Sequence, residues 1–258
     1  MSQNIMTSFQ GNIAKIEIAR PEKRNSLTPE MLLLFEEALI EIRQKKNIQF
    51  VVITGSGDKA FCTGADLNTF AEYDAAAVRE NWVPEGHRIF QRLFDLPQIT
   101  IAQINGDVFG GGLELALSCD LRISRSDARL GFPENRVGTM PGWNGFKRLV
   151  EIIGLSRTKE MILTGESISA EQAKTWGIIN KTCEYSNLST EVDNLISQMS
   201  KSSPIAQRIS KQIINAFQNN QNGTLLESLG GAISHSTKDF KEGVAAFKEK
   251  RSSNFKGE

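Results

Sequence analysis

The sequence predicts an α/β fold over most of the chain, followed by a helical C-terminal region. Short β-branched runs alternate with helical stretches in the first half, as expected of strands joined by crossover helices. Strand signals fade beyond about Lys181, and no internal repeat, Pro-rich linker or low-complexity tract interrupts the chain. We therefore divide the sequence into an α/β core at residues 1–185 and a helical region at residues 186–258.

The first elements follow from periodicity and helix-start signals. Ile13–Ala19 alternates with period two and predicts a strand. Thr28–Glu30 offers a capping residue, a proline for the first turn and an acidic side chain, which predicts a helix reaching about Arg43. Phe50–Thr54 is continuously apolar and suits a strand buried on both faces, ended by the turn Gly55–Asp58.

The middle of the chain contains a loop, a helix, a strand and a glycine run. The loop spans about Phe61–Leu67, and a polar stretch leads to a helix from near Pro84 to Asp95. Ile99–Ile104 predicts another buried strand. Gly110–Ser118 begins with three glycines and continues with helix formers, so the backbone should turn tightly into a helix. The remaining expected elements are the strands Leu121–Ser124 and Arg129–Phe132 and helices near Ser189–Met199, Pro204–Phe217, Leu225–His235 and Phe240–Lys250.

Composition excludes several classes of protein. Thirty Lys plus Arg balance thirty Asp plus Glu, so no long-range field favours nucleic acid or an anionic membrane. The first twelve residues lack the basic and apolar regions of a secretory signal, and no apolar run approaches the ~20 residues of a bilayer span. We expect a cytoplasmic protein without membrane or nucleic-acid partners. Its cysteines, Cys62, Cys119 and Cys183, form no C-x-x-C pair and should be reduced packing residues.

Two glutamates are candidates for acid–base chemistry. Glu114 lies in GGGLELALS, where an ionised carboxylate is costly unless it has a partner or a use. The alternative is a helix-start acid that bonds local backbone. Glu134 follows a strand-like LGF, and its alternative is a solvated ion pair with Arg136. The intervening helix and short β-excursion would allow both carboxyls to meet across one cavity.

Glycine-rich segments offer main-chain hydrogen-bond donors. Gly111 has no Cβ and can present its N–H to a ligand oxygen, and the small residues of Phe61–Asp66 could bring a second N–H to the same oxygen. Plain turns are the alternative for both segments.

Other kinds of site have little support in the sequence. Nucleotide-binding glycine motifs are absent, and His87 and His235 have no metal-ligand spacing. Basic residues near Arg20 and near Lys248 could meet phosphates, although such runs are usually solvated surface.

Five segments together resemble the enoyl-CoA hydratase/isomerase (crotonase) family in order and spacing. These are RPEKRNSLTPEM, AFCTGADL, INGDVFGGGLELALSCDLRI, LGFPENRVGTMPGWNG and LTGESISAEQAKTWGIIN. The resemblance covers about Ile13 to Asn180 and implies a crotonase-like spiral of ββα units with a C-terminal helical region. It also implies a homotrimer or a hexamer, with residues 186–258 serving oligomerisation and covering the active site.

The resemblance implies roles for individual residues. Ala65 and Gly111 would supply the oxyanion hole for a thioester carbonyl, and Glu114 and Glu134 would act on the substrate, with Glu134 as the main acid/base. Trp143 replaces a small residue near the acyl pocket and could change chain-length preference. Candidate contacts to coenzyme A or the acyl group are Lys23, Arg24, Ser26, Ala65, Asp66, Leu67, Gly111 and Trp143.

Both glutamates together favour hydration of a 2-enoyl-CoA thioester. The nearest alternative is a Δ3-Δ2 isomerase, in which Glu134 alone shuttles a proton and Glu114 shapes the pocket. A non-catalytic crotonase-fold protein that binds acyl-CoA or RNA is a further alternative. We expect no metal and no redox cofactor, since coenzyme A enters as part of the substrate.

Overall fold

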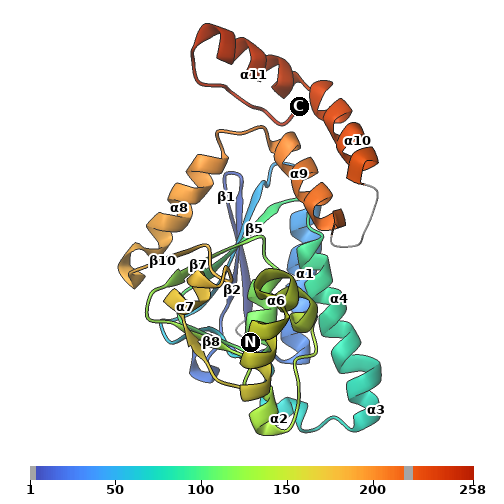
Figure 1. The fold of residues 1–258 in the computed structure, drawn as a ribbon, viewed down its shortest axis with the longest axis vertical. Coiled ribbons are helices and arrows are strands. Elements are labelled where there is room, and N and C mark those ends of the chain that lie inside the picture. The colour runs from blue at the N-terminus through green and yellow to red at the C-terminus, as the bar shows by residue number, and fades with distance from the viewer. Residues whose placement is uncertain (1–3, 218–222) are drawn as a thin grey trace. The chain divides into compact units, whose positions relative to one another are not determined.

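The computed structural model describes residues 4–217 and 223–258, which form two compact units (Figure 1). The first unit extends to Leu96 and continues over Thr100–Val192. The second unit comprises Asp193–Glu258 together with Pro97–Ile99. The expected division at residues 185 and 186 stays a prediction.

Two sheets organise the first unit. The six-stranded sheet has the order β1-β2-β3-β5-β7-β10, with β1 antiparallel to β2 and parallel pairing between β2 and β3, β5 and β7, and β7 and β10. The four-stranded sheet has the order β4-β6-β8-β9. The strands are β1 Ile5–Gln10, β2 Ile13–Ile18, β3 Phe50–Gly55, β4 Ala60–Cys62, β5 Ile99–Ile104, β6 Asp107–Phe109, β7 Leu121–Arg125, β8 Arg129–Gly131, β9 Ile168–Ser169 and β10 Lys181–Cys183.

Successive strands alternate between the two sheets before a helix follows. β5 and β6 lead into α5 (Gly111–Leu117), and β7 and β8 lead through a 3-10 turn into α6 (Gly145–Thr164). β3 and β4 likewise precede a helical segment. Each repeat therefore adds one strand to each sheet, and this is the spiral of ββα units that the family resemblance implied.

The long helices α1 and α4 of the first unit place their apolar faces in the hydrophobic core. α1 (Pro29–Gln44) begins at Thr28, whose side chain accepts a hydrogen bond from the Met31 amide at 3.3 Å. α1 and α4 (Val83–Phe94) lie side by side, where Glu36 pairs with Arg88 and Arg92 (Figure 1). The other helical segments are α2 Leu67–Phe70, α3 Ala75–Ala77, a π-helix Val78–Trp82, α7 Ala170–Thr175, α8 Leu188–Met199, α9 Pro204–Phe217, α10 Gly223–His235, α11 Lys238–Glu249 and 3-10 turns at Pro21–Lys23, Glu134–Val137 and Tyr185–Asn187.

The strongly patterned elements match their predictions, and several others were not expected. The stretch before Pro84, which the sequence analysis described only as polar, is helical in three short pieces, and α6 was not predicted. α6 lacks a side-chain cap and contains the non-helical Gly154 (φ +77°), so it shows neither a clear start nor an unbroken period. β1 and the three-residue strands β4, β6 and β10 were also missed. Residues 1–3 of the N-terminal segment lie outside the described residues, as do residues 218–222 of the predicted helical region.

Among residues 4–217 and 223–258, no helix has both the length and the apolarity needed to cross a membrane.

Candidate active site

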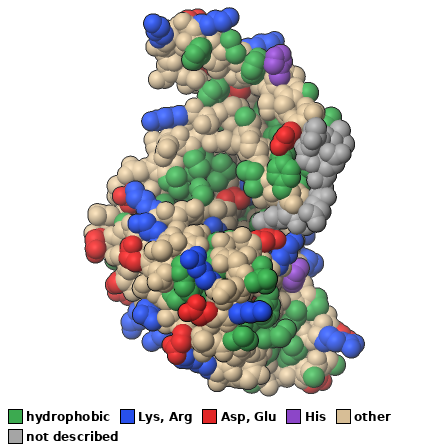
Figure 2. Space-filling model, in the orientation of Figure 1, with side chains coloured by type: hydrophobic (Ala, Val, Ile, Leu, Met, Phe, Trp, Pro, Cys, Tyr) green, Lys and Arg blue, Asp and Glu red, His purple; other side chains and the backbone are tan. Residues whose placement is uncertain are grey.

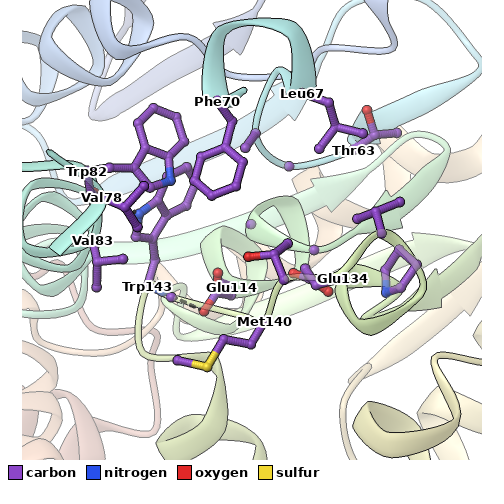
Figure 3. Close-up of a pocket in the computed structure, with 18 of the residues that line it drawn as sticks. Thr63, Leu67, Phe70, Val78, Trp82, Val83, Glu114, Glu134, Met140 and Trp143 are labelled. Atoms are coloured by element: carbon purple, nitrogen blue, oxygen red, sulfur yellow. Dashed lines mark hydrogen bonds between the residues drawn. The ribbon is translucent and has the colours of Figure 1, made fainter. Parts of the chain in front are cut away.

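One cavity of about 270 Å³ in the first unit brings together the residues singled out for chemistry. Its lining includes Ala65, Gly111, Glu114 and Glu134, which come from the loop after β4, from α5 and from the turn after β8. Figure 3 shows the Glu114 and Glu134 side chains near one another among the residues that line this cavity. The expected meeting of the two glutamates is therefore observed.

Glu114 is buried and held by distant main chain. Its side chain is 2% exposed, and Oε1 accepts hydrogen bonds from the Trp143 amide at 2.7 Å and the Gly145 amide at 2.8 Å. A Cβ on Gly145 would lie 2.7 Å from this oxygen, so the close approach depends on glycine. These partners lie 29 and 31 residues along the chain, which excludes the interpretation that Glu114 bonds only its local backbone.

Burial sets the acidity of Glu114. It raises the pKa to about 7, while the amides of Gly145, Trp143 and Gly142 and the charge of Arg148 oppose the rise. A carboxyl with this pKa exchanges protons readily near neutral pH.

Glu134 opens the 3-10 turn after β8 and points into the same cavity. Its Oε2 is buried and accepts no hydrogen bond from the part of the chain that the structure describes. Arg136 pairs with Glu166 instead, so the expected alternative of an ion pair with Glu134 is not observed. Burial raises the pKa of Glu134 to about 7; its own backbone amide opposes this shift and the charge of Glu114 adds to it.

The main-chain amides of Ala65 and Gly111 are positioned by their neighbours. The Leu27 amide donates to the Gly64 carbonyl at 2.7 Å, and the Asp66 amide donates to the Leu27 carbonyl at 2.8 Å. This parallel bridge leaves the Ala65 amide pointing to the opposite side.

Gly111 is the first residue of α5, so its amide has no acceptor within the helix. The two segments touch, because a Cβ on Gly64 (φ +90°) would lie 2.8 Å from the Gly111 nitrogen. Two donors and two carboxyls thus line one cavity.

Aromatic side chains form the apolar wall beside these groups. The Trp143 ring lies 5.1 Å from Trp82 and 5.2 Å from Phe90, and Trp82 lies 5.6 Å from Phe70. Trp143 was a candidate from the sequence, whereas Phe70 and Trp82 were missed. Trp82 stood in a stretch interpreted as polar, where a lone tryptophan was the available signal.

Comparison with known proteins assigns the chain to a family. A family model described as enoyl-CoA hydratase/isomerase matches residues 8–258. The chain belongs to the enoyl-CoA hydratase/isomerase family. It is 34% identical to the short-chain-enoyl-CoA hydratase of Clostridium acetobutylicum, over 96% of this chain and 95% of that one. It is 32% identical to the crotonyl-CoA hydratase of Syntrophomonas wolfei, over 98% of both chains.

A solved structure supports the same assignment of fold. The crystal structure of an enoyl-CoA hydratase from Bacillus anthracis superimposes with a TM-score of 0.94 at 36% identity, covering 99% of this chain and 100% of that one. This enoyl-CoA hydratase/isomerase family member therefore has the crotonase fold, and the expected resemblance is confirmed over nearly the whole chain.

Some of the candidate coenzyme A contacts line the cavity, and others lie outside it. Leu67 is 55% exposed and lines the cavity. Lys23, Arg24 and Ser26 lie outside the cavity lining, and the Arg24 carbonyl accepts a hydrogen bond from the Thr63 hydroxyl at 3.2 Å. The first two side chains are exposed, which leaves them accessible to a phosphate.

Asp66 has structural partners. Its carboxylate pairs with Arg20 at 2.6 Å and caps α2 by accepting from the Asn68 amide at 3.0 Å. Burial alone would raise the pKa of Asp66, but Arg20 and the capping amides hold it below its usual value. Arg20 also donates to the Ser26 hydroxyl at 3.3 Å, so this ion pair braces the loop that carries Ala65.

Arg148 is a buried residue near the site that sequence reasoning missed. It is 4% exposed, its guanidinium stacks over the Phe94 ring at 5.0 Å, and Nη2 donates to Gln91 Oε1 at 3.3 Å. Burial lowers its pKa to about 10, while the charge of Glu114 opposes the shift. The only signal in the sequence was a basic residue beside Leu149 in an unpredicted helix.

Proposed function

We propose that the protein is an enoyl-CoA hydratase, which adds water across the C2=C3 bond of a 2-enoyl-CoA thioester. The observation that carries this proposal is the convergence of two carboxyls, the buried Glu114 and the half-buried Glu134, each with a pKa of about 7, and two main-chain amides on one cavity. Family membership supports it, as do the relatives named short-chain-enoyl-CoA hydratase and crotonyl-CoA hydratase.

The amides act on the thioester carbonyl. As the oxygen of water reaches C3, negative charge moves to the carbonyl oxygen, where the amides of Ala65 and Gly111 donate hydrogen bonds. Donors aimed at this developing charge stabilise the transition state more than the ground state, and losing one typically costs about 3 to 4 kcal/mol.

The carboxyls move protons. Glu114, fixed by two amides, orients the water. Glu134 has an oxygen without a protein partner among the described residues, so it is free to take a proton from water and return one to C2. The net reaction places the hydroxyl on C3 and the hydrogen on C2. Acid–base help of this kind contributes on the order of 10²–10⁴-fold.

The test is hydration of crotonyl-CoA, followed by loss of enoyl absorbance. We expect Glu134→Gln and Glu114→Gln each to lower kcat by about 10²–10⁴-fold while thioester binding survives. Glu160→Gln, an identical change at an exposed position of α6, should leave the rate unchanged. A glutamate variant that keeps nearly the full rate would remove that residue from the mechanism.

A Δ3-Δ2 isomerase is the second candidate, since the matching family model covers hydratases and isomerases alike. In that reaction Glu134 alone shuttles a proton between two carbons. A Glu114→Gln variant that loses hydration of 2-enoyl-CoA but still isomerises 3-enoyl-CoA would favour the isomerase.

A binding module is the third candidate and requires no turnover. Acidic and basic side chains are interspersed on the face that Figure 2 shows, and the formal net charge is zero, which does not favour RNA. Salt-sensitive RNA binding without thioester turnover would support this alternative.

The remaining expectations extend the proposal. We propose that the protein is cytoplasmic and that it assembles as a homotrimer or hexamer through its C-terminal helices. Sedimentation measures the oligomeric state. No metal and no redox cofactor enters the proposed steps, so dialysis against EDTA should leave kcat unchanged. A loss of activity that an added divalent ion restores would contradict this mechanism.

A further inference from the structure

The cavity lining combines exposed and buried side chains. Leu67 and Val137, which are 55% and 59% exposed, belong to its lining, whereas Trp82 and Trp143 are 5% and 2% exposed. Figure 3 shows Thr63 and Leu67 on the opposite side of the view from Trp143 and Trp82, with Phe70 between the two pairs and the two glutamates below. A thioester held at the glutamates therefore directs one part of the substrate to solvent and the other toward the tryptophans.

The indole of Trp143 begins directly beside the proposed carbonyl site. A Cβ on Gly111 would lie 2.5 Å from Cζ3 of this ring, so the ring packs against the residue whose amide faces the thioester. An acyl chain that continues past the reacting carbons meets the indole and, beyond it, Trp82 and Phe70.

Several contacts prevent the indole from moving aside. Its Nε1 donates to the Trp82 carbonyl at 3.2 Å, and the ring stacks edge-on against Phe90. The ring also fills the space left by the missing side chain of Gly86, where a Cβ would overlap it. The Trp143 amide is tied to Glu114 at 2.7 Å. Moving the indole would break the hydrogen bond or disturb packed side chains.

We propose that the Trp143 side chain closes the acyl pocket and restricts the enzyme to short-chain 2-enoyl-CoA substrates. This inference rests on the proposed hydratase function and adds its substrate class. A long acyl chain would need the space that the indole occupies, and displacing a packed, hydrogen-bonded ring opposes its binding.

The experiment compares kcat/KM for crotonyl-CoA and trans-2-decenoyl-CoA in the full-length protein. We expect the wild type to favour crotonyl-CoA by at least about tenfold. Trp143→Leu should raise the decenoyl-to-crotonyl ratio by at least about tenfold, and Trp143→Phe should raise it by a smaller factor. Trp176→Leu is the matched control, because Trp176 lies outside the cavity lining and stacks with Arg157 at 5.3 Å; its ratio should equal that of the wild type.

The outcomes separate this inference from the proposed function. Failure of the wild type to hydrate either substrate would overturn the hydratase function itself. Hydration of crotonyl-CoA with no change of ratio in the Trp143 variants, or a wild type that prefers decenoyl-CoA, would overturn only the role of Trp143. Circular dichroism shows whether each variant folds. If Trp143→Leu does not fold, Trp143→Phe, which keeps an aromatic ring in the cluster, tests whether Trp143 limits the acyl-chain length.

Discussion

Glu114 and Glu134 each have a pKa of about 7, but different neighbours set the two values. Glu114 is buried and Glu134 is half-buried, and the loss of surrounding water raises the pKa of each carboxyl from the ordinary value of 4.5. Glu114 retains two main-chain donors, whereas Oε2 of Glu134 has no partner among the described residues. The site therefore pairs a fixed carboxyl with one that has a free acceptor.

The raised pKa values carry a stability cost at alkaline pH. The unfolded chain ionises these carboxyls near 4.5, whereas the folded protein keeps their protons up to about pH 7. The folded state therefore binds more protons between these values, and its free energy of unfolding falls as pH rises through this window. The stability gained from keeping these carboxyls protonated is fully present only below about pH 4.5.

We therefore expect Glu134→Gln to be more thermostable than the wild type, and by a larger margin at pH 8 than at pH 5. Glutamine cannot ionise, so it removes the cost that grows across this range. Thermal unfolding at the two pH values measures the margin, with Glu160→Gln as the exposed control. The same margin at both values would show that burial does not shift the carboxyl.

Arg148 should tune Glu114 through its charge. Because this charge lowers the pKa of Glu114, Arg148→Met should raise that pKa further and move the acidic limb of the kcat/KM profile to higher pH. Arg148→Lys keeps the charge and should return the limb toward its wild-type position. An unmoved limb in a folded Arg148→Met variant would exclude electrostatic tuning by this residue.

At the scale of elements, the packing of α5 against β4 places the Gly111 amide. A Cβ on Gly112 would overlap the Cys62 carbonyl, so glycine allows the helix to approach the strand. We expect Gly112→Ala to lower the free energy of unfolding by about 1–3 kcal/mol and to depress kcat, because α5 must move away.

Gly231→Ala provides the control for this change. Gly231 is an exposed position of α10 with no atom within 4 Å of an added Cβ. Alanine favours the helix there by up to about 1 kcal/mol, so stability should stay the same or rise. Chemical denaturation measures both variants, and equal effects would show that the contact with Cys62 carries no strain.

Strongly patterned elements were predictable, and weakly marked ones were not. β3 is buried at all six positions and α1 begins with a side-chain cap, so local sequence was sufficient for both. β4 and β6 contain three residues each and exist because they pair with one another, which local pattern does not record. The spiral came from the family resemblance rather than from periodicity.

The candidate site was predictable in its chemistry but not in its supporting contacts. Glu114 was recognisable because it is an acidic residue among glycines and apolar residues. Its hydrogen-bond partners Trp143 and Gly145, however, belong to a distant segment of the chain. Arg148 lies on an unpredicted helix, so its place near Glu114 depended on tertiary packing. Individual residues of the site were identified from motifs, whereas their hydrogen bonds required the fold.

At the scale of the whole molecule, the C-terminal unit carries apolar surface of its own. Phe247 on α11 is 85% exposed and borders a cavity of about 350 Å³ within this unit. Phe240 and Val244 of the same helix, 40% and 37% exposed, line this cavity too, and a contiguous apolar patch is typical of an association surface. Phe247 is therefore a direct probe of the proposed trimer or hexamer.

We expect Phe247→Ser to shift the protein toward smaller species in sedimentation velocity, because it removes apolar area from the proposed contact. Lys248→Ser alters the adjoining exposed position and should leave the distribution unchanged. A wild type that sediments as a monomer would contradict the assembly, and an unaffected oligomer would place the contact elsewhere.

The parallel bridge between Leu27 and Ala65 decides how the proposed oxyanion donor will respond to mutagenesis. The bridge uses the main chain on either side of Ala65, so the direction of its amide is set without its own side chain. Single side-chain substitutions at Ala65 would consequently underestimate the contribution of its amide to catalysis. Exchanging the amide for an ester by chemical synthesis would delete the donor alone and expose the catalytic contribution that side-chain replacement conceals.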